Sequence, residues 1–230
     1  MFVSVPVQRR PSHRWAVPLL FAAMWLAFAW ARMQPDEARR SLWLGWGALS
    51  HGLADPAAWW ASLRDGSALR LFTSLFLHAD WAHLLGNLVF LLIFGLPAEK
   101  VMGPWRLLGL FLVGGALANL VAVLAIGVPG RVVIGASGAV SAMIGAYLAL
   151  FPGARLGVVL PLGLFLEFVR APAYLMIGAW ALLQVAFAYT GPAYGEVAWP
   201  AHITGFVLGV AYGLWVRGAI ARRLRRQRGF

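Results

Sequence analysis

The sequence has no cysteine, which excludes disulfide bonds, thiolate metal sites and a cysteine nucleophile. It also has few charges: 12% of its 230 residues are Asp, Glu, Lys or Arg, whereas 61% are hydrophobic. A soluble fold could not cover so large an apolar fraction with polar surface. Its 12 tryptophans suit a chain with much membrane–water interface, where indole rings prefer to lie. We therefore expect an all-α polytopic membrane protein.

Six apolar segments come close to the roughly 20 residues that a helix needs to cross a bilayer. They cover residues 15–33, 80–97, 105–127, 135–151, 171–190 and 198–216. The first follows a basic stretch and contains Ala-x-Ala triplets, so a cleaved signal peptide is the alternative interpretation. Its apolar run is long for a signal peptide, and we prefer an uncleaved anchor. The sequence thus predicts a six-helix membrane domain over residues 15–216, with tails at 1–14 and 217–230.

The positive charges are distributed unevenly along these segments. If the N-terminus is cytoplasmic, the whole net charge of +11 falls on the inner segments, and the outer ones are neutral overall. This is the asymmetry that the positive-inside rule requires, so we expect both tails to be cytoplasmic. The basic tail at 217–230 is then explained by orientation and lipid contact, and we expect no nucleic acid partner.

Two connections are long enough to be more than simple links. Residues 34–79 form an outer loop in which tryptophans alternate with small residues and glycines break any long helix. A mildly apolar loop of this kind indicates a structure lying in the outer membrane interface. Residues 152–170 form an inner connection that is either re-entrant or interfacial.

Three polar fragments open the second, fourth and sixth apolar segments, which all run inward from the outer face. The second contains His83 and Asn87, spaced i and i+4 on one helical face, the fourth contains Ser137, and the sixth contains His202. Small residues in the fourth and sixth segments would let their helices approach closely: Gly135, Gly138, Ser141, Gly205 and Gly209. The three fragments are therefore predicted to meet at one depth, towards the outer face.

A hydroxyl, two imidazoles and a carboxamide at one depth have the chemistry of a hydrolytic site. A serine hydroxyl becomes a nucleophile when an adjacent imidazole accepts its proton, and the amide and second imidazole can donate to an oxyanion. Taken singly, each residue has a plainer explanation, as a helix-packing group or as part of a proton path. A transporter would, however, need polar groups through the whole membrane thickness, and the inner halves of these segments are almost wholly apolar. We expect neither a metal nor a cofactor.

Four stretches, at residues 76–87, 135–141, 151–155 and 198–206, resemble rhomboid intramembrane serine proteases of bacterial type in order and spacing. The resemblance runs from about residue 69 to residue 216. It implies a six-helix rhomboid-like bundle in which Ser137 is the nucleophile and His202 the general base. It further implies that His83, Asn87 and the backbone N–H of Ser137 stabilise the oxyanion.

The resemblance also implies the setting of the reaction. The partners would be transmembrane protein substrates and membrane lipid, and the location would be the inner membrane of a bacterium. One departure concerns Ser141, where some family members have an aromatic residue that stacks on the base, so the sequence leaves open what orients His202. An inactive, client-binding relative is the other interpretation, although such relatives generally lose the serine or the histidine.

Overall fold

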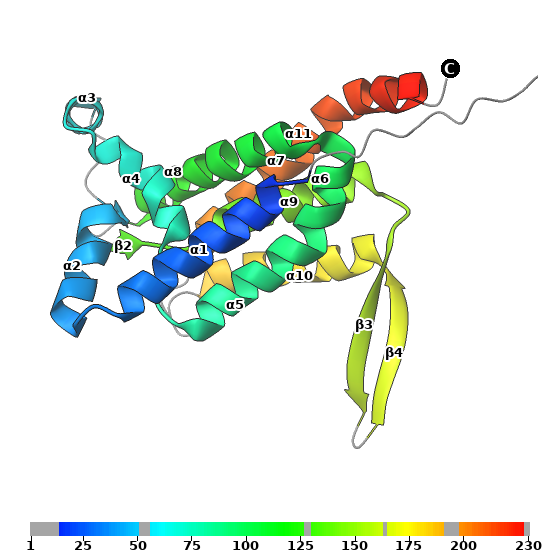
Figure 1. The fold of residues 1–230 in the computed structure, drawn as a ribbon, viewed down its shortest axis with the longest axis horizontal. Coiled ribbons are helices and arrows are strands. Elements are labelled where there is room, and N and C mark those ends of the chain that lie inside the picture. The colour runs from blue at the N-terminus through cyan, green and yellow to red at the C-terminus, as the bar shows by residue number, and fades with distance from the viewer. Residues whose placement is uncertain (1–13, 51–55, 127–129, 163–164, 191–197, 228–230) are drawn as a thin grey trace, which may run out of the picture.

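The computed structural model describes residues 14–50, 56–126, 130–162, 165–190 and 198–227, and shows a bundle of apolar helices with short helices at one end (Figure 1). Most of the predicted tail at 1–14, and residues 228–230 of the second tail, lie outside the described residues. Six helical segments correspond to the six predicted ones. They are α1 (Ala16–Arg32), α5–η3–α6 (Trp81–Met102), α7–η4–α8 (Pro104–Ala125), α9 (Ser137–Leu150), α10 (Ala173–Thr190) and α11 (Trp199–Gln227).

Three of these segments are long and apolar enough to cross a membrane, namely Trp81–Met102, Pro104–Ala125 and the first 24 residues of α11. In the first, α5 (Trp81–Phe90) and α6 (Leu96–Met102) are joined by the π-helical turn η3 (Leu91–Gly95). In the second, η4 (Leu110–Gly114) joins α7 (Pro104–Gly109) to α8 (Gly115–Ala125) in the same way. The helices α1, α9 and α10 are apolar but shorter. The fold is therefore an all-α polytopic membrane fold.

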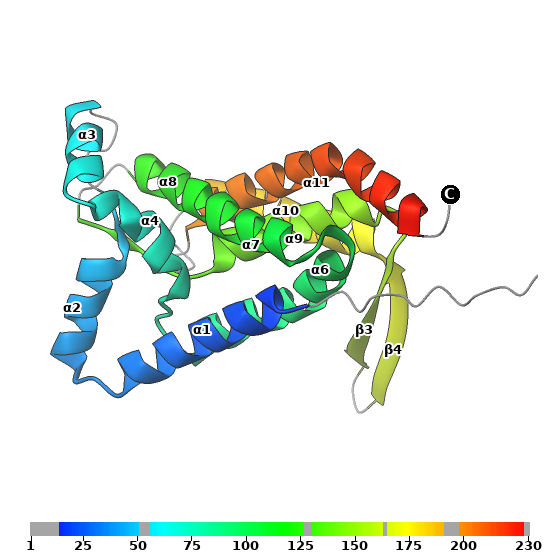
Figure 2. The same ribbon diagram turned by 45° about the horizontal axis from the view of Figure 1, so that its top comes forward.

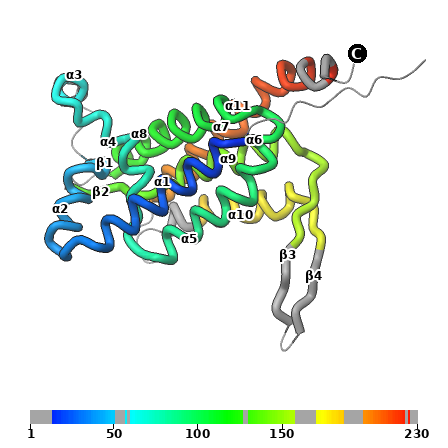
Figure 3. Tube along the Cα trace, viewed as in Figure 1, coloured from blue at the N-terminus to red at the C-terminus, as the bar shows by residue number. Residues whose placement is uncertain are grey.

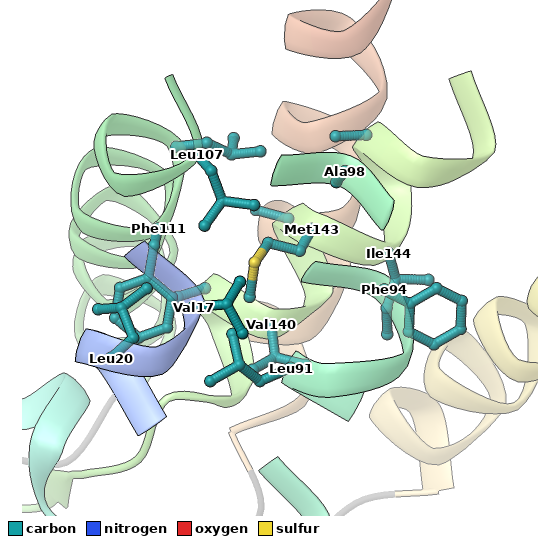
Figure 4. Packing of buried hydrophobic residues seen from close by; sticks show 14 of the residues in the cluster. Val17, Leu20, Leu91, Phe94, Ala98, Leu107, Phe111, Val140, Met143 and Ile144 are labelled. Atoms are coloured by element: carbon teal, nitrogen blue, oxygen red, sulfur yellow. The ribbon is translucent and has the colours of Figure 1, made fainter. Parts of the chain in front are cut away.

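Helix α9 lies at the centre of the bundle (Figure 3). Most of its residues are buried. Val140, Met143 and Ile144 pack against side chains of α1, η3, α6, α7 and η4, including Phe111 and Leu91 (Figure 4). With 14 residues, α9 is only about 21 Å long, which is less than the hydrocarbon thickness of about 30 Å. Gly135 and Ala136, which precede it, are buried as well, and Ser137 at its start is partly buried.

The outer loop at 34–79 consists of short helices where it is described. They are α2 (Asp36–Trp46), α3 (Pro56–Arg64), η1 (Ser67–Leu69), α4 (Arg70–Thr73) and η2 (Ser74–Phe76). Between them, β1 (Ala48–Leu49) pairs antiparallel with β2 (Val132–Val133), which ties the loop to the segment before α9. Trp46 and Trp60 are exposed. Their location in the membrane interface stays a prediction.

The connection at 152–170, which the sequence left as re-entrant or interfacial, has a secondary structure that the sequence pattern did not indicate. It forms a β-hairpin of β3 (Arg155–Leu162) and β4 (Phe165–Pro172), which projects away from the helices and does not re-enter the bundle (Figure 2). The physical reason is local: Pro152 and Gly153 end the preceding helix, and the branched and aromatic residues that follow favour strands. A short apolar run alone cannot distinguish a strand from a helix.

Helix α11 continues without a break past residue 216 to Gln227, and the end of the membrane domain at residue 216 stays a prediction. Arginines are good helix formers, so a change from apolar to basic composition does not end a helix. The start of α1 and the end of α11 lie at the same end of the bundle, opposite α2 and α3 (Figure 1). This arrangement agrees with an even number of crossings, and the side on which the two ends lie stays a prediction.

Candidate functional site

The segment before α9 lies directly against the first turn of α5. Gly135 has φ +114°, and a β-carbon at this residue would overlap the Nε2 atom of His83. His83 is held in place because Asp80 caps α5: its Oδ1 accepts the His83 backbone N–H at 2.9 Å. One turn further along, the amide of the buried Asn87 donates to the His83 carbonyl at 3.0 Å. His83 on α5 therefore adjoins the segment that leads into Ser137, and Asn87 lies one turn further along the same helix.

Ser137 is the first residue of α9 and is partly buried. Its backbone N–H belongs to the first turn, whose amide groups have no partner within the helix and can bind a negative charge. The hydroxyl of Ser141 donates to the Ser137 carbonyl at 2.7 Å. Ser141 thus uses its hydroxyl inside its own helix.

Glycines allow α9 and α11 to lie in backbone contact. A β-carbon on Gly205 would overlap the Gly138 carbonyl oxygen, and one on Gly209 would overlap the Ala142 carbonyl oxygen. One on Gly138 would lie 3.5 Å from the backbone oxygen of Ala201, the residue that precedes His202. The starts of the two helices are therefore adjacent, and with α5 they bring the three polar fragments together.

His202 lies in the first turn of α11 and contacts a residue that the sequence analysis missed. Its Nδ1 atom lies 2.7 Å from Oε1 of Gln184 on α10, and its ring meets the Trp199 ring edge-on at 5.6 Å. Gln184 is the sole amide of the predicted fifth apolar segment. A lone polar side chain in such a segment is itself a signal of function, and it could have indicated this residue.

An apolar cavity of about 360 Å³ separates part of α10 from α11. Gln184 and His202 lie in its wall, together with Trp180 and Phe206, whose ring centroids are 6.0 Å apart. The rest of the lining is apolar. The hydrogen bond between the two helices is thus formed in a medium of low polarity.

A second chain of hydrogen bonds holds the segment that leads into Ser137. The amide of Asn119 on α8, 1% exposed, donates to the Leu71 carbonyl at 3.2 Å and to the Ser74 hydroxyl at 2.9 Å. The Ser74 carbonyl in turn accepts the Gly135 backbone N–H at 2.9 Å. The position of Gly135 therefore depends on contacts from the outer loop and α8.

His78 precedes α5, at the end of the outer loop. The structure buries it to 2% exposure, with its ring edge-on to His83 at 5.0 Å between ring centroids. Burial, and secondarily the proximity of His83, lowers the pKa of His78 from 6.5 to about 3. His51, the other outer-loop histidine, lies outside the described residues. Within the described part of the chain, no three acidic or imidazole side chains are grouped to hold a metal ion.

Comparison with known proteins identifies the family. Residues 65–219 match the family model described as the Rhomboid domain. The chain is 30% identical over 160 residues to RHOMBOID-like protein 5 of Arabidopsis thaliana, covering 60% of this chain and 51% of the relative. It is 29% identical over 172 residues to Rhomboid protein 1, mitochondrial, of Saccharomyces cerevisiae, covering 70% and 45%.

A third relative is Rhomboid-like protease 2 of Toxoplasma gondii, 30% identical over 154 residues, covering 67% of this chain and 50% of the relative. The chain therefore spans about half the length of the curated relatives that it matches. The family match, in contrast, covers well over half of the chain and includes every helix from α4 to α10 and α11 as far as residue 219. The chain belongs to the rhomboid family.

Proposed function

We propose that this protein is a serine endopeptidase that cleaves peptide bonds in or next to transmembrane segments of other membrane proteins. The observation that carries the proposal is the packing of α9 on α11 through Gly138 and Gly205, which brings Ser137 and His202 to adjacent helix starts. The relationship to rhomboid proteins supports the same reaction class.

In the proposed reaction, the Ser137 oxygen attacks the carbonyl carbon of the substrate while its proton passes to His202. The tetrahedral intermediate collapses as His202 gives this proton to the leaving amine, which produces an acyl-enzyme. Water then attacks the acyl group while His202 takes a proton from it. His202 gives this proton to the Ser137 oxygen as the acid product leaves. His83, Asn87 and the Ser137 backbone N–H lie in the right segments to donate to the oxyanion.

The proposal includes the setting inferred from the sequence. The protein would lie in the inner membrane of a bacterium as a multi-pass protein with both termini in the cytoplasm and the site towards the outer face. Its partners would be transmembrane substrates and membrane lipid. Substrate helices would have to unwind locally, because a helical carbonyl is engaged in an i to i+4 hydrogen bond.

The test uses the purified protein in detergent with a single-span substrate and a fluorophosphonate probe, which labels activated serines. Ser137→Ala and His202→Ala should each eliminate cleavage and labelling, whereas the exposed Ser41→Ala should behave as wild type. Asn87→Ala should lower turnover by about 10²–10³-fold, the cost of one oxyanion donor. Normal cleavage by Ser137→Ala would refute the proposed site, and equal labelling in wild type and His202→Ala would make Ser137 an ordinary packing residue.

A further inference from the structure

The contact between Gln184 and His202 determines which nitrogen of the imidazole carries its proton. The atom that faces Nδ1, at 2.7 Å, is the amide oxygen of Gln184, which can only accept a hydrogen bond. With the amide in this orientation, Nδ1 carries the hydrogen. A neutral imidazole has a single N–H, so Nε2 is then left with its lone pair free.

A free Nε2 is what a general base needs. In the common Ser-His-Asp arrangement a buried carboxylate fixes this tautomer by accepting from Nδ1. In the described part of this chain no carboxylate lies on α9, α10 or α11. Ser141, at the position where some relatives have a stacking aromatic residue, donates to the carbonyl of Ser137 instead. Gln184 occupies the place that the carboxylate has in a triad.

Because its surroundings are apolar, this hydrogen bond is stronger than one on the protein surface. Gln184 is 8% exposed, and the adjoining cavity is lined by apolar groups apart from the indole of Trp180. Hydrogen bonds are stronger in such a medium, and a buried amide without a partner is costly. The bond also crosses between two helices, so the position of α10 affects the orientation of a ring on α11.

We propose that Gln184 is a positioning residue that fixes the Nδ1–H tautomer of His202 and holds its ring for proton transfer from Ser137. This inference rests on the proposed function. When the Ser137 O–H bond breaks, the proton goes to Nε2, the serine oxygen bonds to the substrate carbon, and the ring becomes a cation. Gln184 takes no proton, and its hydrogen bond to Nδ1–H becomes charge-assisted and therefore stronger.

The first experiment is independent of cleavage. ¹⁵N spectra of the full-length protein labelled at histidine, with His202 assigned by its loss in His202→Ala, report which ring nitrogen is protonated. Wild type should show Nδ1–H, and Gln184→Leu, which keeps the approximate volume and removes the acceptor, should lose this preference. A wild-type ring protonated at Nε2, or a tautomer unchanged in Gln184→Leu, would overturn the inference.

The second experiment measures kcat, KM and their pH dependence. Gln184→Leu should lower kcat by about 100-fold with little change in KM, because the base is misplaced and substrate contacts remain. Gln184→Glu keeps an acceptor and adds a negative charge that favours the imidazolium, so it should retain activity and move the acidic limb of the profile to higher pH. The matched control is Leu183→Ala, on the exposed side of α10, which should match wild type.

The outcomes separate the two proposals. Equal losses in Gln184→Leu and Gln184→Glu with an unshifted pH profile would make Gln184 a packing residue and overturn the inference while the serine protease function stands. Cleavage that persists in Ser137→Ala would overturn the function itself and with it the catalytic role of Gln184. The tautomer would then still be reported by the ¹⁵N spectra.

Discussion

The imidazole of His83 fills the space that a side chain on Gly135 would need. Gly135 has a positive φ, and a β-carbon there would overlap Nε2 of His83. Two separate constraints therefore favour glycine at this position: a backbone conformation that other residues rarely adopt, and close approach to a ring from another helix.

Gly135→Ala should therefore impair the site severely. The added methyl group must displace either the His83 ring or the segment that leads into Ser137, and a displacement of about 1 Å can lower turnover about 100-fold. Cleavage of a single-span substrate measures the effect, and thermal unfolding checks that the fold is retained. Gly109→Ala is the matched control, because nothing lies near its β-carbon position and alanine favours a helix. Normal turnover by Gly135→Ala would contradict the contact with His83.

Glu99 should be important for stability. The structure buries it to 1% exposure, where its two carboxylate oxygens accept the backbone N–H groups of Ala16 and Val17 at 2.8 and 3.1 Å. Glu99→Ala leaves both N–H groups at the start of α1 without this partner, so we expect unfolding to become easier by about 1–3 kcal/mol. Thermal unfolding in detergent measures the change.

Glu99→Gln should lose less stability, since one carboxamide oxygen can still accept. The exposed Glu37→Gln on α2 provides the control and should stay within about 0.5 kcal/mol of wild type. A stability of Glu99→Ala equal to that of the control would show that water replaces the carboxylate without cost.

The burial of His78 makes stability depend on pH. Its pKa is about 3 in the folded protein and 6.5 in the unfolded chain, because burial and then the neighbouring His83 disfavour the cation. Between these values the unfolded state binds more protons, so this contribution is complete above pH 6.5 and is lost as the pH falls towards 3. The slope can reach about 1.4 kcal/mol per pH unit.

Thermal unfolding of wild type and His78→Gln, compared from pH 8 to pH 4, tests this dependence. The variant should differ from wild type by a constant amount above pH 6.5 and should lose stability less steeply below it. Parallel curves over the whole range would mean that His78 is protonated in the folded state as readily as in water.

The absence of cysteine makes the orientation directly measurable, because single cysteines can be introduced without removing native ones. Glu37 on α2 and Arg225 on α11 are both exposed and lie towards opposite ends of the bundle. We expect an impermeant thiol reagent added outside intact cells to label Glu37→Cys and to spare Arg225→Cys until the membrane is opened. The reverse pattern would invert the proposed topology and place the site towards the cytoplasm.

The all-α membrane fold and the rhomboid relationship could be predicted from the sequence, and both are confirmed. Both depend on features that are local in sequence: long apolar runs, and polar groups at fixed spacing within them. The hairpin at β3 and β4 was not predicted, since the pattern of a short apolar run does not by itself distinguish a strand from a helix.

The sequence marks Gln184 as an amide in an apolar segment, but it does not show that this amide contacts His202. Which face of α10 meets α11 is decided by packing in three dimensions, and α10 carries no strong amphipathic pattern that would indicate it. The burial of His78 likewise depends on how the outer loop folds onto α5. The catalytic roles of Ser137 and His202 stay predictions until cleavage is measured.

Helix α11 is a single rod of 29 residues, about 44 Å long, with His202 near one end and exposed Arg217, Arg222 and Arg225 towards the other. Arginines that interact with lipid headgroups would anchor the far end at the membrane surface. Tilting of this helix is one way to accommodate a thinner or thicker bilayer. Such a tilt would move the His202 imidazole relative to α9 and α10. The thickness of the surrounding membrane would then affect the geometry of the site.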